Sequence, residues 1–452
     1  MTTADLPTLV QRRLEFSGDP LLAIAALASA GLNAEYLCYE NGAEWCFASG
    51  AQLTIRLDRH GLRMTGLCEA ELGWDGAPLA QLGRLLDSLP LADWRAYGWA
   101  AFELAYAKDG DLTEIGDQTL LQLVIPSTEV RISDGSALLR SLNPDQLDRI
   151  QLALMAPDER RREPAPLDVR RHGSPGYQNA VARAVAEIRA HQLDKVVLSR
   201  RVPLDQEIDF VASYVAGRRA NEPARSFLMQ LDGMAAAGFS PEIVVQVDAA
   251  GRVVSQPLAG TRALTANSTL NAALHEELTT DPKEIYEHAI SVKTACDELR
   301  PICEAGSLVI EEFMTVKHRG TVQHLGSQVA GQLAAGHSCW DAFGAVFPAV
   351  TASGVPKPAA YASIRANESG ARGLYSGTVL TVDRDGSMDA ALVLRALYRQ
   401  HGVSWLQAGA GIVGQSCPER EFEETCEKLD SVARYLVAAG SPQAADGRCR
   451  DA

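Results

Sequence analysis

The strongest constraint on the fold is a series of apolar runs joined by tight turns. Ser307–Leu333 is predicted to form a hairpin turning at His318-Arg319-Gly320, and Leu374–Tyr398 a second hairpin turning at Asp383–Gly386. Strands joined by such short turns run antiparallel, because a parallel crossover needs a dozen or more residues. Helical patterns lie between these runs. The sequence therefore predicts an α+β fold with α/β layering, in which one large domain of mainly antiparallel sheets is flanked by helices.

Further elements are predicted on both sides of Ala156–Asp168, a charged and proline-rich stretch that is the best linker candidate. The predicted helices are Asp145–Met155, Ser174–His191, Asp281–Ile302 and Ser416–Ala439, and the other predicted strands include a hairpin over Glu35–Asp58, Lys195–Leu204, Arg225–Leu231, Met234–Phe239 and Glu242–Val247. We expect residues 1–165 to be a structural N-terminal part, 166–440 the functional part and 441–452 a flexible tail. The linker need not separate independent domains, so all three belong to one compact unit.

Charge and cysteine usage exclude several classes of function. The net charge of −15 disfavours nucleic-acid binding, which needs a basic patch, and adsorption to anionic membranes. The first residues lack a signal-peptide pattern, and the longest apolar run, around Leu21–Leu32, is too short to span a bilayer. The nine cysteines are irregularly spaced, which is typical of a reduced compartment. We expect a cytoplasmic protein with no nucleic-acid or membrane partner, and a small anionic substrate stays possible because local cations can reverse the field in a cleft.

The predicted helix over Asp281–Ile302 carries two glutamates on one flank. Asp281 is the predicted N-cap, and Glu284 lies where the second residue of a capping box would be. When residues are placed at 100° steps, Glu287 lies on the same side of the helix, away from the predicted apolar stripe of Ile285, Ala289, Val292, Cys296 and Leu299. A solvated helix face, with Glu284 in a capping role alone, is the competing interpretation.

The predicted final helix has the same design. Ser416 and Glu419 match a capping box, and Glu421, Glu424 and Lys428 share one flank. Two such flanks could meet around one Mg²⁺ ion, which takes a few carboxylates together with water and substrate oxygens. A di-iron bundle is the rival metal site, but it requires Glu-x-x-His pairs that neither helix contains. The spacing alone leaves a metal site and a solvated face both open.

Four polar residues within or beside apolar strands are further candidates. Lys195 could act as a base if it is desolvated in a cleft, or extend to solvent at a sheet edge. Glu242 could be a buried acid with a raised pKa or a solvated turn residue. His324 on its strand is more typical of a hydrogen-bonded structural residue than of a catalyst. Arg395 follows an apolar run, and a buried arginine needs an anionic partner such as a substrate carboxylate.

Three glycine-rich segments of the second half are predicted to be turns. They are Pro257–Thr261, Gly373–Gly377 and Ala408–Gly411. Exposed backbone N–H groups at such turns can bind carboxylates. Simple turn geometry explains the glycines equally well, and none of the three has the spacing of a P-loop or a dinucleotide-binding loop.

Taken together, the segments resemble the chorismate-utilising enzymes, which include anthranilate, aminodeoxychorismate, isochorismate and salicylate synthases. The likeness covers roughly residues 177–436 and rests on nine ordered motifs: DKVVLSR, GFSPE, PLAGTR, KEIYEHAISV, TVQHLGS, FPAVTASGVPK, GLYSGTV, AGAGIV and EREFEETCEKL. The first 165 residues are less diagnostic, although EYLCYENGAEW and YGWAAFELAY are similar to the N-terminal half of the salicylate-forming members. The resemblance implies a fold like that of anthranilate synthase component I.

The resemblance also implies roles for individual residues. Lys195 occupies the place of the general base that activates water, and Glu242 that of the acid that protonates the departing ring hydroxyl. Glu287 and Glu424 match Mg²⁺ ligands, with Glu284 and Glu421 in or beside the coordination sphere. The remaining matched positions bind chorismate, and they are Gly260, Thr261, His324, Thr351, Tyr375, Arg395, Gly409 and Lys428.

Two positions distinguish reactions within the family. Ala259 stands where aminodeoxychorismate synthases usually carry lysine, and Lys195 stands where ammonia-using members usually carry glutamine. We therefore expect water as the nucleophile, isochorismate as the first product, no amidotransferase subunit and a monomeric enzyme. The overall likeness favours members that go on to release pyruvate and form salicylate for siderophore assembly. An isochorismate synthase without lyase activity is the alternative, and a non-catalytic scaffold is disfavoured because both Lys195 and Glu242 are present.

Overall fold

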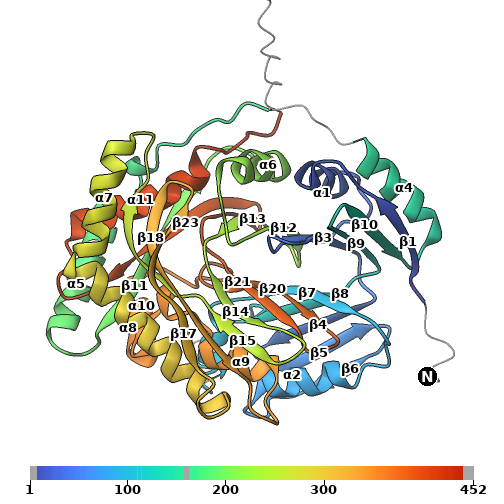
Figure 1. Cartoon of the computed structure of the whole chain (residues 1–452), viewed down its shortest axis with the longest axis horizontal. Helices are drawn as coiled ribbons and strands as arrows, with labels where there is room; N and C mark the ends of the chain where they lie inside the picture. The colour runs from blue at the N-terminus through green and yellow to red at the C-terminus, as the bar shows by residue number, and fades with distance from the viewer. Residues whose placement is uncertain (1–7, 109, 114, 157–161, 441–452) are drawn as a thin grey trace, which may run out of the picture.

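Two large antiparallel sheets form the body of the protein, as the computed structural model shows (Figure 1). The structure describes residues 8–108, 110–113, 115–156 and 162–440. The predicted tail at 441–452 and residues 157–161 of the predicted linker lie outside these ranges. The mixed architecture of helices and antiparallel sheets confirms the predicted fold class.

The first sheet has eleven strands in the described part of the chain, in the order β1-β10-β9-β3-β2-β12-β13-β22-β23-β11-β19, and its neighbours are antiparallel. Its strands are β1 Val10–Glu15, β2 Tyr36–Glu40, β3 Trp45–Ser49, β9 Thr128–Ser133, β10 Ser136–Ser141, β11 Lys195–Leu204, β12 Arg225–Leu231, β13 Met234–Ser240, β19 Gly354–Val355, β22 Ala396–Gln400 and β23 Val403–Ile412.

The second sheet follows the order β16-β18-β15-β14-β21-β20-β7-β8-β4-β5-β6, with β17 paired to β18. Its strands are β4 Leu53–Asp58, β5 Gly61–Gly66, β6 Ala70–Leu72, β7 Arg95–Ala100, β8 Leu121–Ile125, β14 Ile243–Val247, β15 Arg252–Ser255, β16 Leu258–Ala263, β17 Val309–Arg319, β18 Val322–Gln332, β20 Thr378–Asp383 and β21 Met388–Leu392.

Helices cover the outer faces of both sheets (Figure 1). They are α1 Pro20–Ser29, α2 Pro78–Asp87, α3 Leu104–Lys108, α4 Pro144–Met155, α5 Ser174–Arg189, α6 Phe210–Ala220, α7 Ser268–Thr280, α8 Pro282–Leu299, α9 Cys339–Val346, α10 Lys357–Asn367 and α11 Pro418–Ala433, with short 3₁₀ turns at Val169–Arg171, Arg300–Ile302 and Val350–Ala352. Helices α1, α4 and α6 lie over the first sheet, while α2 and α9 lie under the second (Figure 1). No helix in the described ranges has the length and apolar character needed to cross a membrane.

Both parts of the chain contribute to each sheet. Strand β2 pairs with β12 in the first sheet, and β7 pairs with β20 in the second. Between the sheets, Phe227 and Met229 from one face pack with Trp99 and Val379 from the other in a shared apolar layer. Burial of such side chains is the main stabilising contribution to folding. The two parts are therefore joined within one core.

Two of the short crossings by which the chain passes between the sheets border the candidate site, and the sequence did not reveal them. Pro241-Glu242 joins β13 of the first sheet to β14 of the second, and Val393–Arg395 joins β21 back to β22. The predicted hairpin over Leu374–Tyr398 is therefore correct only for β20 and β21, because Tyr398 lies in the other sheet. The same correction applies to Glu35–Asp58, in which β2 and β3 form the hairpin and β4 changes sheet.

Helix α8 buries the flank that its apolar pattern assigned to solvent. Glu284, Glu287, His288 and Ser291 are all buried, whereas Ile285 in the predicted stripe is only half-buried. The flank faces β16 and β18, which pack against this helix. The helix thus presents its polar residues to the interior.

The two predicted capping boxes are wrong. Asp281 caps α8 as predicted, accepting from the Lys283 N–H group at 2.8 Å, but the Glu284 carboxylate turns to the Thr261 N–H group and to Arg262 instead of its own helix start. Ser416 accepts a hydrogen bond from the backbone N–H group of Val413. Helix α11 therefore begins after Cys417 without a side-chain cap.

Candidate active site

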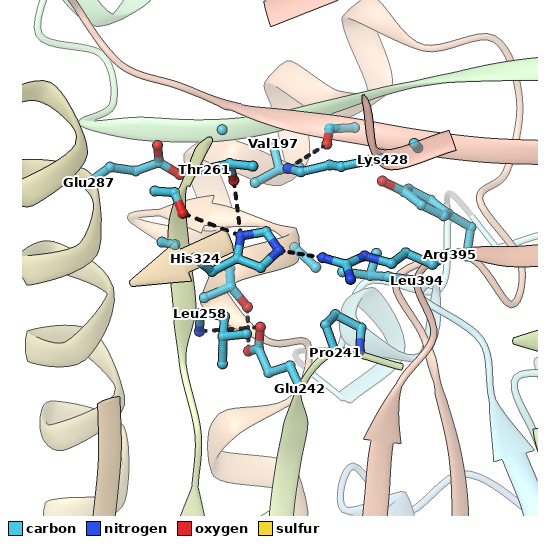
Figure 2. Close-up of a pocket in the computed structure, with 18 residues that line it drawn as sticks. Val197, Pro241, Glu242, Leu258, Thr261, Glu287, His324, Leu394, Arg395 and Lys428 are labelled. Atoms are coloured by element: carbon cyan, nitrogen blue, oxygen red, sulfur yellow. Dashed lines mark hydrogen bonds between the residues drawn. The ribbon is translucent and has the colours of Figure 1, made fainter. Parts of the chain in front are cut away.

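A cavity of about 610 Å³, counting its open mouth, lies where the two crossings meet helices α8 and α11. Its wall is formed by Val197, Pro241, Glu242, Leu258, Ala259, Gly260, Thr261, Glu287, His324, Thr351, Ala352, Tyr375, Leu394, Arg395, Ala408, Gly409, Gly411 and Lys428. Figure 2 shows Glu242 at one end of this space, with Glu287 and Lys428 toward the other. The cavity combines a few charged groups with an apolar wall, as small-molecule sites usually do.

Glu242 is a buried carboxyl group on the first crossing. The Thr351 hydroxyl donates to its Oε1 atom at 2.5 Å, and the Leu258 N–H group lies 3.3 Å from Oε2. Burial raises the pKa of Glu242 to about 8, and these hydrogen bonds offset only part of that effect. Glu242 therefore carries its proton at neutral pH and can donate it to a leaving group.

Arg395 lies on the second crossing and points into the cavity (Figure 2). Its φ angle of +51° places it in the left-handed region, which a non-glycine residue rarely adopts. Its guanidinium donates to the Arg319 carbonyl oxygen and to His324 Nε2. Burial lowers the pKa of Arg395 to about 9, with a further contribution from nearby Arg319, so it stays cationic at neutral pH.

Arg395 forms no ion pair with a carboxylate among the described residues. A desolvated cation without a counter-charge is costly, so this end of the cavity is suited to an anion. His324 is held neutral because burial and the adjacent Arg395 lower its pKa. Since its Nε2 accepts from Arg395, its Nδ1 carries the proton and faces Thr261 Oγ1 at 3.1 Å.

Lys195 lies at the start of β11, with its side chain fully buried (0% exposed). Its Nζ atom is 3.1 Å from Glu287 Oε1 and donates to Ser291 Oγ at 3.0 Å. Glu287 lines the cavity, while Lys195 lies just behind it. Lys195 is therefore held in the interior by α8 and does not lie at a solvated sheet edge.

Four glutamates converge beside the cavity and form a glutamate cluster: Glu284 and Glu287 of α8, and Glu421 and Glu424 of α11, all buried. Among the described residues, however, no group of three or more acidic, histidine or cysteine side chains already has the geometry of a metal site. The ammonium group of Lys283 lies between the helices, 3.2 Å from Glu284 Oε1 and 3.1 Å from Glu421 Oε1. Cations of the protein thus balance these carboxylates.

The chemistry of this cluster fits a hard cation. Both carboxylate oxygens of Glu421 are buried and accept no hydrogen bond from the described residues, although Lys283 is near. Burial, together with the neighbouring Glu424, raises the pKa of Glu421. Burial opposes ionisation of Glu424 as well, but Lys428 and Lys283 outweigh it and lower the pKa of that residue. Carboxylate oxygens, completed by water and substrate oxygens, are the ligands that Mg²⁺ prefers, so these residues fit that ion.

Two of the three predicted glycine turns are strands. Pro257–Thr261 runs mainly into β16, and Ala408–Gly411 lies inside β23. A Cβ atom at Gly411 would come within 2.1 Å of Glu287 Oε1. A glycine in a strand interior often marks such a close approach. These segments therefore form walls of the cavity.

Ten of the fourteen residues predicted for the site line the cavity. The four that do not are Lys195, Glu284, Glu421 and Glu424, which lie behind the wall in contact with one another or with lining residues. Tyr375 is buried, and Lys428 Nζ donates to the Gly409 carbonyl oxygen at 3.0 Å.

Sequence reasoning missed Lys283 and Arg262, which contact the predicted glutamates, and gave no role to Ser291, which contacts Lys195. Lys283 and Ser291 lie on α8 at the spacing of its buried polar flank. That spacing was the sequence signal that could have identified these two residues.

The sequence matches a family model described as chorismate binding enzyme over residues 35–434. The chain therefore belongs to the chorismate-binding enzymes, as its motifs indicated. It is 42% identical over 418 residues to a salicylate synthase of Mycolicibacterium paratuberculosis, and the alignment covers 92% of each chain. It is 34% identical over 268 residues to an anthranilate synthase component 1 of Aquifex aeolicus, covering 59% of this chain and 54% of that one.

Two solved structures have the same fold. Anthranilate synthase component I of Streptococcus pneumoniae superposes with a TM-score of 0.72 at 24% identity, covering 87% of this chain and 93% of that one. The menaquinone-specific isochorismate synthase of Escherichia coli superposes with a TM-score of 0.72 at 23% identity, covering 95% of both chains. The predicted likeness to the anthranilate synthase component I fold is thereby confirmed.

Proposed function

We propose that the protein is a Mg²⁺-dependent salicylate synthase that converts chorismate to isochorismate and then to salicylate and pyruvate. The observation that carries the proposal is a proton-bearing Glu242 at one end of a cavity whose other end leads to Lys195 and the glutamate cluster. Similarity to a salicylate synthase over 92% of the chain supports the choice of product.

In the first step, water adds to one ring carbon and hydroxide leaves from another, so an acid and a base are needed on opposite sides of the ring. Glu242 donates its proton to the departing hydroxyl, which leaves as water. Lys195, acting in its deprotonated form, accepts the proton of the attacking water, and Ser291 holds its amine in place. Lysine at this position and Ala259 in the cavity wall support water as the nucleophile, and a reaction with water requires no amidotransferase subunit.

The anionic end of the substrate has a matching cation. Arg395 is desolvated and lacks a carboxylate partner among the described residues, so a bound carboxylate would supply its counter-charge. Tyr375 also lines the cavity. We assign the enolpyruvyl carboxylate of chorismate to this end and its ring carboxylate to the glutamate end.

Glu287 and Glu424 would hold Mg²⁺, with Glu284 and Glu421 beside them. When bound, the ion would neutralise the ring carboxylate and orient the ring. Glu287 already contacts Lys195, so the cation site and the base share one carboxylate.

Pyruvate release is an intramolecular hydrogen transfer from the ring to the enolpyruvyl methylene, with cleavage of the ring C–O bond. Such a step depends on substrate shape and needs no further acid or base. Leu258, Leu394 and Val197 give the cavity an apolar wall that can hold the side chain folded over the ring. Use of the salicylate in siderophore assembly rests on the family resemblance alone.

The test is product analysis with purified protein, chorismate and Mg²⁺. We expect salicylate, followed by its fluorescence, and pyruvate in equal amounts, followed by lactate dehydrogenase. Chromatography separates isochorismate from salicylate. Isochorismate as the final product would favour the alternative, a synthase without lyase activity, and unchanged chorismate would refute both.

A further inference from the structure

Lys283 is a cation held almost entirely by the glutamate cluster. Its Nζ atom lies 3.2 Å from Glu284, 3.1 Å from Glu421 and 4.0 Å from Glu287. These carboxylates come from both α8 and α11, so one ammonium group bridges the two helices. Lys283 is the second residue of α8, and its side chain keeps 13% of its surface exposed. It can therefore turn outward without unfolding the helix.

The other cations around the cluster are fixed by additional partners. Lys195 donates to Ser291, Arg262 pairs with Glu277 and Asp281, and Lys428 donates to the Gly409 carbonyl oxygen. Each would keep a hydrogen-bond partner if its glutamate turned away. Lys283 has the cluster glutamates as its ion-pair partners among the described residues. It is the cation that the cluster can release most easily.

We propose that Lys283 is an internal counter-cation that competes with a divalent metal ion for the carboxylates of α8 and α11. The inference rests on the proposed Mg²⁺ site and deepens it. In the structure each of the four glutamates already pairs with a cation of the protein: Glu287 with Lys195, Glu284 and Glu421 with Lys283, and Glu424 with Lys428, while Arg262 is shared between Glu284 and two carboxylates outside the cluster. A dication that enters must repel the ammonium bridging the helices, because like charges at such short range destabilise each other.

Two consequences follow. Lys283 weakens metal binding, which sets the metal concentration at which the site fills. It also stabilises the pair of helices when metal is scarce, since uncompensated buried carboxylates would repel. Replacement of Lys283 by a neutral residue should therefore strengthen metal binding and weaken the protein without added metal.

The test is calorimetric titration of the full-length protein with Mg²⁺ alone, without substrate. We expect Lys283→Gln to lower the Kd for Mg²⁺ by about tenfold, which corresponds to about 1.4 kcal/mol. The matched control is Lys293→Gln on the same helix, because the Lys293 side chain is 77% exposed and, among the described residues, forms an ion pair with Asp297 alone. That variant removes the same charge far from the cluster and should bind Mg²⁺ as the wild type does.

Thermal unfolding gives an independent readout. Without added metal, Lys283→Gln should melt at a lower temperature than the wild type, and saturating Mg²⁺ should raise its Tm by more. A variant that folds only with Mg²⁺ present would support the proposal in the same way.

Unchanged or weaker Mg²⁺ binding by Lys283→Gln, with normal binding by the wild type, would overturn the counter-cation role and leave the proposed function standing. A wild type that binds no Mg²⁺ would instead overturn the metal site itself.

Discussion

Replacement of Glu242 by glutamine tests the central chemical assignment. Glutamine has the same shape and no proton to donate. Its amide oxygen can accept from the Leu258 N–H group while its NH₂ group donates to the Thr351 hydroxyl oxygen, so both existing partners are kept. A general acid contributes about 10²–10⁴ to a rate. We expect kcat/KM for chorismate consumption at pH 7 to fall by about that factor.

The pH dependence should change as well. Burial raises the pKa of Glu242 to about 8, so the wild-type enzyme should lose activity about tenfold per pH unit above that value as the acid ionises. Glu242→Gln cannot ionise at this position, so its remaining activity should not fall along this limb. The assay is the initial rate of chorismate loss at saturating Mg²⁺, measured between pH 6 and 9.5.

The pH dependence of the free energy of unfolding provides a second measure of the raised pKa of Glu242. The folded pKa is raised from 4.5 to about 8, so the contribution of protonated Glu242 to the free energy of unfolding is complete below pH 4.5. It is lost as pH rises to about 8. At 1.36 kcal/mol per pKa unit, the loss is about 5 kcal/mol. Urea unfolding should show the wild type losing stability relative to Glu242→Gln across this window.

Two results would refute the reasoning. A Glu242→Gln variant within about threefold of wild-type kcat/KM would show that this residue is not the acid. Parallel urea stability curves between pH 4.5 and 8 would show that its carboxyl group is not held protonated by the fold.

Four further substitutions address the rest of the cavity. Glu287→Ala and Glu424→Ala should abolish the Mg²⁺ dependence of activity, and unaltered Mg²⁺ affinity in calorimetry would contradict the assigned ligands. Arg395→Met should raise KM for chorismate by at least about tenfold, because loss of a buried charged partner costs about 2–5 kcal/mol, whereas Mg²⁺ affinity should stay as in the wild type; an unchanged KM would exclude a substrate contact. Gly411→Ala should weaken Mg²⁺ binding, because its Cβ would lie 2.1 Å from Glu287 Oε1, and normal Mg²⁺ titration with this variant would contradict that geometry.

The sequence predicted the elements better than their assignment to sheets. Apolar alternation and turn residues located β20, β21, β17 and β18, because both signals are local along the chain. The sequence around a strand does not indicate which of the two sheets that strand joins. The crossings at Pro241-Glu242 and Val393–Arg395 look like ordinary short connections, and their effect depends on partners far along the chain. Glu242 and Arg395 owe their burial to these crossings, so the residues were identifiable and their environment was not.

The buried flank of α8 shows a second limit. Apolar periodicity assigns the core to the stripe through Val292 and the solvent to the glutamates, because ionised side chains are rarely buried without partners. Here the partners exist, but Lys195 comes from β11 and Arg262 from β16. The sequence of one helix does not show that residues far along the chain will pair with its buried charges. The motif series supplied what periodicity could not, and the residues that it selected do converge on one cavity.

The glycines of β23 explain why that convergence is sterically possible. Gly409 and Gly411 are two residues apart in a strand, so both positions face the same side. A Cβ at Gly409 would lie 2.8 Å from the Tyr375 hydroxyl, and one at Gly411 would meet the Glu287 carboxylate. Because the strand has no side chains at these two positions, groups from other elements can reach the cavity wall. Two glycines at strand spacing inside an otherwise apolar run therefore indicate a face that polar side chains approach closely, a more specific prediction than a turn.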